Sequence, residues 1–206
     1  MLSGVILAGG KGTRMGGRNK ALLQLDGKPL LERQLAVMQR ICSDIVIVAN
    51  DPEAIRPVIQ SRTPFASDCD IQIVPDLYLE CGPLGGIHAA LPHCRNEAAW
   101  LVGCDMPFIS EQAAQYMFAI WQKQQADVVI PADGEMLHPL HGIYAKHIHA
   151  TVEEMLQMKQ YRIQRLLSGL HTITIDFSGN EHSLSNSPPF WTNINTPDDY
   201  ASALQK

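Results

Sequence analysis

Charge is scarce in this chain of 206 residues, and the positive sign is in the minority. Lysine and arginine together number 16 against 21 aspartates and glutamates, which gives a formal net charge of −5. A surface that binds nucleic acid needs a basic excess, so the composition argues against such a partner and leaves room only for a local basic pocket. With 46% hydrophobic residues the chain can still form a full core.

Long hydrophobic runs are also missing. The N-terminal apolar run is far too short for a signal peptide, and no later stretch approaches the roughly 20 apolar residues of a membrane-spanning helix. The five cysteines are odd in number and include no Cys-x-x-Cys pair, so neither a disulfide framework nor a zinc knuckle is expected. We therefore expect reduced thiols, a cytoplasmic location and no membrane partner.

What the sequence does contain is an alternation of short β-branched runs with helical patterns. Such alternation is typical of βαβ units and predicts an α/β fold with a mostly parallel sheet. Strands are predicted at residues 4–8, 45–49, 71–74, 100–103 and 127–131. Helices are predicted at residues 29–41 and 86–91, and from a Ser110 N-cap to residue 124.

The second half of the chain is less regular. Residues 138–144 are interpreted as an irregular strand, 147–156 and 161–167 as helices, 171–176 as a strand, and 178–189 as a polar surface loop. Thr196-Pro-Asp-Asp199 is similar to a capping box that opens a last helix at 200–204. Nothing marks a domain boundary, so we expect one domain, residues 1–206.

A glycine-rich segment follows the first predicted strand directly: Leu7-Ala-Gly-Gly-Lys-Gly-Thr-Arg-Met-Gly-Gly-Arg-Asn-Lys20. Consecutive glycines let the chain turn sharply and expose backbone N–H groups, which bind anions. A flexible turn would explain the glycines alone. The added positive charges of Arg14 and Lys20 favour binding of a polyphosphate.

This segment fits neither of two common phosphate motifs. A Walker A loop needs Ser or Thr after its lysine, whereas Gly12 follows Lys11. The dinucleotide fingerprint needs a third glycine where Met15 stands.

Three predicted strands are followed by a side chain that can bind a nucleotide or a metal ion. Asp105 comes after the strand at 100–103, and open α/β sheets bind ligands at the carboxyl ends of their strands. A carboxylate near a polyphosphate is a natural Mg²⁺ ligand, although an aspartate before Pro107 also suits a turn. Asn50 and Asp76 offer an amide and a carboxylate to a base or ribose, and a simple turn explains both as well.

Two further segments offer polar groups. Gly82-Pro-Leu-Gly-Gly86 precedes a predicted helix, whose N-terminus attracts anions, but a loop-to-helix turn explains it nearly as well. Asn193 and Asn195 flank one residue, so in an extended segment both amides point to the same side, unless one only braces the turn. The eight histidines lack a matching cysteine or carboxylate pattern, so structural or surface roles are favoured for them.

Several motifs in this order resemble one family, the MobA-like nucleotidyltransferases of the molybdenum-cofactor pathway, and among them the molybdenum cofactor guanylyltransferases. The glycine-rich segment carries the resemblance first. It is followed by Leu25-Asp-Gly-Lys-Pro-Leu30, Gly82-Pro-Leu-Gly-Gly-Ile87, Cys104-Asp-Met-Pro-Phe108, His138-Pro-Leu140 and Asn193-Ile-Asn-Thr-Pro197. One departure is Asn19, where relatives often carry aspartate.

The resemblance implies a Rossmann-like three-layer α/β/α fold of the nucleotide-diphospho-sugar transferase type. It implies a nucleotide-binding part at about residues 1–110 and an acceptor-binding part at about 111–206. The implied reaction transfers GMP from GTP to the terminal phosphate of molybdopterin with Mg²⁺ and releases pyrophosphate. Gly9-Gly10 favours GTP, because cytidylyl relatives tend to read Leu-Ala-Ala-Gly.

The resemblance also implies a role for each matching residue. Catalysis is expected of Arg14, Lys20 and Asp105, with Asp105 as the metal ligand. Nucleotide binding is expected of Leu7, Ala8, Gly9, Gly10, Lys20, Asn50, Asp76, Gly82 and Asp105, and acceptor binding of His138, Asn193 and Asn195. Transient docking to cofactor-biosynthesis proteins or acceptor molybdoenzymes is expected as well. The alternatives are a cytidylyltransferase or other nucleotidyltransferase acting on a related phosphorylated acceptor, and a non-catalytic nucleotide-binding or cofactor-delivery protein.

Overall fold

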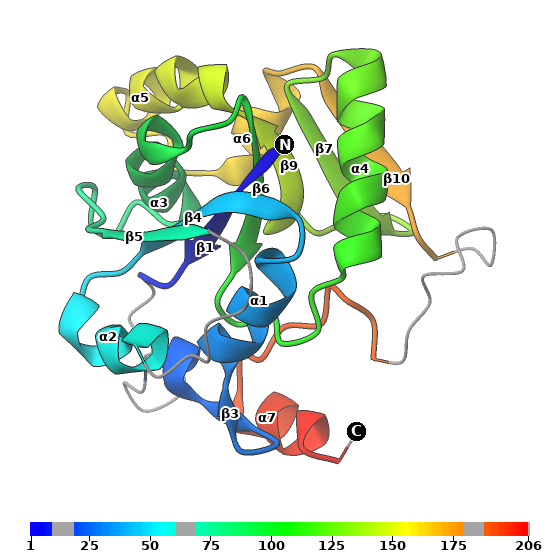
Figure 1. The fold of residues 1–206 in the computed structure, drawn as a ribbon. Helices are drawn as coiled ribbons and strands as arrows, with labels where there is room; N and C mark the ends of the chain where they lie inside the picture. The colour runs from blue at the N-terminus through cyan, green and yellow to red at the C-terminus, as the bar shows by residue number, and fades with distance from the viewer. Residues whose placement is uncertain (10–18, 61–68, 179–187, 206) are drawn as a thin grey trace.

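An eight-stranded sheet forms the centre of the protein, seen here in a computed structural model that describes residues 1–9, 19–60, 69–178 and 188–205 (Figure 1). The strand order is β10-β7-β9-β6-β1-β4-β5, and β8 pairs with β7. The strands are β1 (Leu2–Leu7), β4 (Cys42–Val48), β5 (Asp70–Val74), β6 (Ala98–Gly103), β7 (Val128–Asp133), β8 (Met136–Leu137), β9 (His141–Ala145) and β10 (Thr172–Asp176). Most neighbours run parallel, while β9 is antiparallel to β6 and β7, and β8 is antiparallel to β7. The predicted mostly parallel sheet is confirmed.

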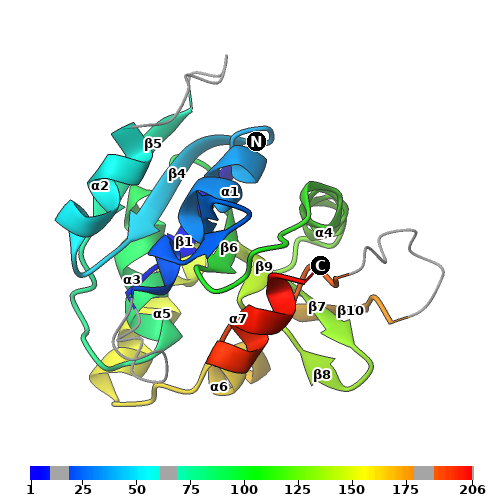
Figure 2. The same cartoon turned by 90° about the horizontal axis from the view of Figure 1, so that it is seen from below.

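Helices cover both faces of this sheet, as the view from below shows (Figure 2). Neighbouring residues in a strand point to opposite faces, so Ile6 belongs to one core and Val5 to the other. The core that contains Ile6 is covered by α1 (Leu30–Met38), α2 (Pro52–Gln60) and α4 (Glu111–Gln124). The opposite core is covered by α3 (Pro83–Ala90), α5 (His149–Gln157) and α6 (Ile163–Ser168). These layers confirm the three-layer α/β/α arrangement.

The last helix, α7 (Pro197–Ala203), lies beside a small hairpin of β2 (Gln24–Leu25) and β3 (Lys28–Pro29) (Figure 1). Asp26 and Gly27 turn the hairpin with φ angles of 52° and 74°, the left-handed backbone that a two-residue hairpin loop requires. Short 3₁₀ turns lie at Lys20–Leu22, Leu91–His93 and Lys146–Ile148.

Both predicted N-caps are confirmed. Ser110 accepts a hydrogen bond from the Ala113 N–H at the start of α4, and Thr196 forms a capping box with Asp199 at the start of α7. In contrast, α3 starts at Pro83 and not at residue 86, and α2 and the β2–β3 hairpin were not predicted. The loop predicted at 178–189 falls mostly outside the described residues.

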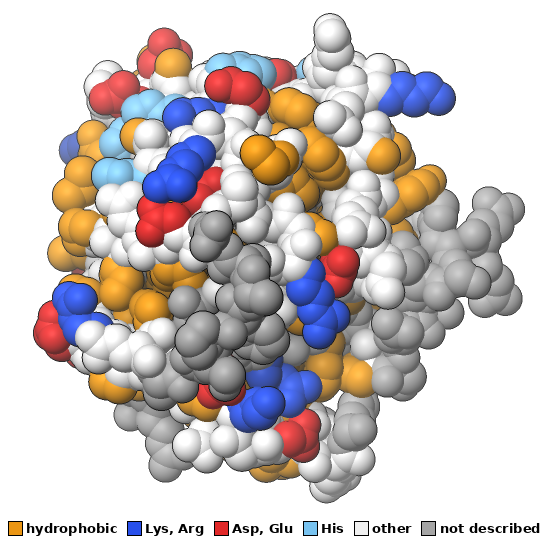
Figure 3. All heavy atoms as spheres, viewed as in Figure 1, with side chains coloured by type: hydrophobic (Ala, Val, Ile, Leu, Met, Phe, Trp, Pro, Cys, Tyr) orange, Lys and Arg blue, Asp and Glu red, His pale blue; other side chains and the backbone are white. Residues whose placement is uncertain are grey.

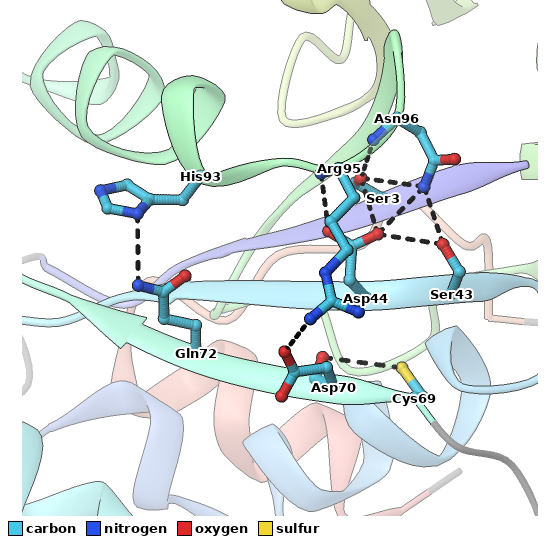
Figure 4. A network of polar contacts seen from close by, with 9 residues as sticks. All are labelled: Ser3, Ser43, Asp44, Cys69, Asp70, Gln72, His93, Arg95 and Asn96. Atoms are coloured by element: carbon cyan, nitrogen blue, oxygen red, sulfur yellow. Dashed lines mark hydrogen bonds and ion pairs between the residues drawn. The ribbon is translucent and has the colours of Figure 1, made fainter.

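A buried carboxylate ties together the amino-terminal ends of two strands and the turn before a third (Figure 4). Asp44 in β4 is 4% exposed. It accepts hydrogen bonds from the hydroxyls of Ser3 in β1 and Ser43, the side-chain amide of Asn96 and the backbone N–H of Arg95, at 2.9 to 3.1 Å. Buried carboxylates persist only when hydrogen-bonded in this way, so this network fixes the end of the sheet opposite the cavity described below. Within the described part of the chain, no helix has the length and apolar character needed to cross a membrane.

Candidate active site

A cavity of about 870 Å³ opens at the carboxyl ends of β1, β4 and β6. These strands end in the cavity-lining residues Leu7, Val48 and Gly103. Parallel strands bring such ends to one edge of the sheet, where open α/β folds bind ligands, and the volume suits a small-molecule substrate. The cavity is lined by Leu7, Gly9, Lys20, Val48, Asn50, Asp76, Leu79, Glu80, Gly82, Pro83, Gly86, Gly103, Cys104, Asp105, Leu140 and Asn195.

One ammonium group links two distant parts of the chain inside this cavity. Lys20 Nζ lies 3.2 Å from Asp105 Oδ2 and donates a hydrogen bond of 2.7 Å to Asn195 Oδ1. The side chains of Lys20 and Asp105 are only 18% and 21% exposed. Because part of their surface is removed from water, this cluster interacts more strongly than a fully exposed ion pair.

Backbone contacts hold Asn195 in place. The Ile194 N–H donates to the Asp105 carbonyl at 2.8 Å, so the segment before α7 lies directly against the end of β6. The Asn195 N–H in turn donates to Asp199 Oδ2 at 2.9 Å. A residue near the C-terminus is thereby placed beside the lysine that ends the glycine-rich segment.

Glycines allow the first turn of α3 to pack closely against the cavity wall. A Cβ at Gly85 would lie 2.6 Å from the Tyr78 carbonyl oxygen, and one at Gly86 would lie 2.9 Å from Leu7 Cδ2. Gly82 precedes the helix with a φ of 63°, a conformation that other residues rarely adopt. This close packing brings the N-terminus of α3, which favours negative charge, to the cavity wall.

Asn50 and Asp76 lie beside Gly9, near the start of the glycine-rich segment. Asn50 Nδ2 donates to the Gly9 carbonyl at 3.1 Å, and Asp76 Oδ1 accepts from the Tyr78 N–H at 2.9 Å. Burial raises the pKa of the Asp76 carboxyl, with the hydrogen bond from Tyr78 acting in the other direction. Both side chains reach the cavity.

No activated thiol is found among the described residues that line the cavity. Cys104 lies in the wall, and burial raises the pKa of its thiol to about 12. The sulfur therefore stays protonated near neutral pH, which makes it a poor nucleophile.

The structure brings together most of the predicted site residues. Leu7, Gly9, Lys20, Asn50, Asp76, Gly82, Asp105 and Asn195 line the cavity. Gly10 and Arg14 lie outside the described residues. Among the described residues, three predicted site residues do not line the cavity: Ala8, His138 and Asn193. Ala8 is buried, and Asn193 is exposed. The ring of His138 stacks on that of Trp191, with centroids 5.4 Å apart. Sequence reasoning did not single out Leu79 and Glu80, because the loop that carries them has no distinctive motif.

The donor chemistry around Lys20 fits a divalent cation. Asp105 and Asn195 present a carboxylate oxygen and an amide oxygen, and together they already hold a positive charge, the Lys20 ammonium. Mg²⁺ prefers such oxygen ligands, usually one or two carboxylates supplemented by water and phosphate oxygens. These two residues are therefore suited to hold Mg²⁺ beside a bound polyphosphate.

Comparisons with known proteins identify the family of the chain. A probable molybdenum cofactor guanylyltransferase of Clostridium perfringens is 31% identical over 99% of this chain and 96% of its own length. A molybdenum cofactor guanylyltransferase of Vibrio cholerae is 32% identical over 97% of this chain and 89% of its own length. Among solved structures, the molybdopterin-guanine dinucleotide biosynthesis protein A of Archaeoglobus fulgidus has the same fold, with a TM-score of 0.80 and 24% identity over 99% of this chain and 97% of that one. Residues 4–173 match the family model of the MobA-like NTP transferase domain, and the chain belongs to that family.

Proposed function

We propose that this protein transfers GMP from GTP to the terminal phosphate of molybdopterin in a Mg²⁺-dependent reaction that releases pyrophosphate. The observation that carries the proposal is the meeting of Lys20, Asp105 and Asn195 in a cavity at the carboxyl edge of the sheet. The guanylyltransferase names of relatives that align over nearly the whole chain support the choice of both substrates.

The proposed reaction is a single displacement at the α-phosphorus of GTP. An oxygen of the acceptor phosphate forms the new bond to phosphorus, and the bond to the pyrophosphate oxygen breaks. No covalent enzyme intermediate is needed, so the protein acts by positioning the reactants and by neutralising charge. Lys20 would donate to phosphate oxygens as a fixed positive charge, and Arg14 is proposed to do the same.

Asp105 and Asn195 would hold Mg²⁺, with Asp105 as the anionic ligand. When bound there, the ion supplies further positive charge to the phosphate oxygens. Leu7 to Gly10 would offer backbone groups to the nucleotide, while Asn50, Asp76 and Gly82 would contact its base and ribose. The contact between Lys20 and Asn195 supports a nucleotide-binding part at about 1–110 that meets an acceptor-binding part at about 111–206.

The choice of GTP rests on the pair Gly9-Gly10 and on the names of the relatives. His138 and Asn193 remain proposed acceptor contacts, together with Asn195. We also propose a cytoplasmic location and transient docking to the proteins that supply the pterin or receive the product.

The experiment is a comparison of nucleoside triphosphates. Purified protein is mixed with Mg²⁺, molybdopterin and one triphosphate at a time, and pyrophosphate release is followed with and without the acceptor. GTP should support fast, acceptor-dependent release that stops when the metal is chelated. A preference for CTP would instead identify a cytidylyltransferase, and GTP binding without any release would identify a nucleotide-binding or cofactor-delivery protein.

A further inference from the structure

Three side chains that can bind a metal ion meet on the face of the sheet covered by α3 and α5. His88 lies in the last turn of α3, while His149 and Glu153 lie one helical turn apart on α5. One ligand atom from each residue lies within 4.8 Å of the other two. Histidine side chains are visible at the surface in the region of these helices (Figure 3). None of the three residues lines the cavity described above.

The imidazole nitrogens here lack hydrogen-bond partners. Both ring nitrogens of His88 and Nε2 of His149 are buried and make no hydrogen bond within the described part of the chain. The two rings stack with centroids 4.4 Å apart, and Tyr78 packs edge-on against His88 at 4.9 Å. Buried polar atoms are almost always paired, because an unpaired one costs free energy. Three unpaired nitrogens next to a carboxylate therefore point to a missing ligand.

We propose that His88, His149 and Glu153 form a Zn²⁺ site. Two imidazole nitrogens and one carboxylate oxygen are a set of three protein ligands that Zn²⁺ uses, with a fourth position left for water. Metal–ligand bonds of about 2.0–2.2 Å require the ligand atoms to approach one another by side-chain rotation when the ion binds. Mg²⁺ prefers oxygen ligands only, so this site is chemically distinct from the one proposed at Asp105.

The ion would join α3 and α5, two helices that pack against each other. The first turn of α3 carries Gly82, Pro83 and Gly86 into the cavity wall, whereas His88 lies at the other end of the helix. Zn²⁺ would thus fix α3 against α5 without touching a nucleotide. Its expected effect is on stability, which can be measured whether or not the protein transfers GMP.

The test uses the full chain without a polyhistidine tag, freed of metal by a chelator and titrated with Zn²⁺ in a calorimeter. One ion per chain should bind, and Zn²⁺ at 100 times its dissociation constant should raise Tm by about 5–10 °C. Loss of even an outer-shell partner weakens metal sites about 10–100-fold, so His149→Gln and Glu153→Gln should each weaken binding by about 100-fold or more. His171→Gln, at an exposed histidine, is the matched control and should bind as the unaltered chain does.

Absence of stoichiometric binding, or binding that survives both substitutions, would overturn the proposal. A Co²⁺ spectrum of the unaltered chain gives a second reading that does not depend on the folding of variants. Visible bands of low-symmetry Co²⁺ without a thiolate charge-transfer band are expected. A strong thiolate band would place the ion on cysteine and refute the site, as would displacement of the ion by excess Mg²⁺.

Discussion

Replacing Gly103 by alanine should disable the proposed transfer site and leave the fold almost as stable as before. Gly103 is the last residue of β6, two positions before Asp105. A Cβ at this position would lie 2.7 Å from Asp105 Oδ1 but 3.6 Å from its next neighbour, Leu140 Cδ1. Only the first contact is too short. The Asp105 carboxylate must therefore shift, which we expect to disturb the 3.2 Å contact between its other oxygen, Oδ2, and Lys20 Nζ.

The expected effects on stability and on activity differ widely in size. Loss of this ion pair should cost about 1 kcal/mol, the upper end of the range for exposed pairs, because both side chains keep some contact with water. Alanine has less backbone freedom than glycine in the unfolded chain, which returns about 0.4–1 kcal/mol. Tm should therefore stay within about 4 °C of the unaltered chain. A misplacement of about 1 Å at a reacting centre can cost about 100-fold in rate, so we expect kcat/KM for GTP to fall by about that factor.

The assay is acceptor-dependent pyrophosphate release, with a thermal melt of each variant. Gly169→Ala serves as the control, because a Cβ there would meet no atom closer than 3.6 Å. If Gly103→Ala acts through Asp105, adding it to Asp105→Ala should cause no further loss. Activity within about threefold of the unaltered chain, or a further loss in the double variant, would refute the reasoning.

Other side chains give three more predictions. Asp44→Ala leaves several donors unpaired, so urea unfolding should show a loss of about 3 kcal/mol, with KM unchanged; full stability would contradict this. Burial lowers the pKa of His141 to about 3 from 6.5, so the unfolded chain binds the proton first. The free energy of unfolding should thus fall by up to about 1.4 kcal/mol for each pH unit between pH 6.5 and pH 3. The His141→Gln variant should show a smaller fall per pH unit. Lys20→Ala should lower kcat/KM at least about 100-fold, with Tm little changed; near-normal turnover would exclude its proposed role.

Much of the fold follows from local patterns. Short runs of β-branched residues are buried on both faces of a parallel sheet, so they are recognisable one by one, as at β1 and β4. The direction of β9 is set by the pairing of whole strands and is not visible in its own residues. The helix α2 escaped prediction because Pro57 lies inside it, and an internal proline normally argues against a helix.

The first residue of α3 was predicted wrongly for a different reason. Two consecutive glycines lower the helix propensity of its first turn, so local propensity favours a helix that starts later in the sequence. In the structure Gly85 and Gly86 lie inside the helix, and this part of the helix packs so closely that a Cβ would come within 2.6 Å of the Tyr78 carbonyl oxygen at Gly85 and within 2.9 Å of Leu7 at Gly86. Packing against another part of the chain outweighs local propensity here.

The part of the site that follows the parallel strands could be predicted from the geometry of the sheet. Asp105, Asn50 and Asp76 follow parallel strands, and the carboxyl ends of such strands share one edge of the sheet. The hydrogen bond between Lys20 and Asn195 joins residues 175 positions apart, and only folding reveals it. The approach of His88 to α5 is likewise a product of helix packing.

The identity of the product formed from GTP and molybdopterin tests the proposed transfer most directly. GTP labelled in its α-phosphate is incubated with the protein, Mg²⁺ and molybdopterin. The products are separated, and their masses are measured by mass spectrometry. The proposed function predicts a labelled dinucleotide with the mass of molybdopterin plus GMP, less water, and one pyrophosphate for each molecule formed. Label found only in GTP or free GMP would contradict it.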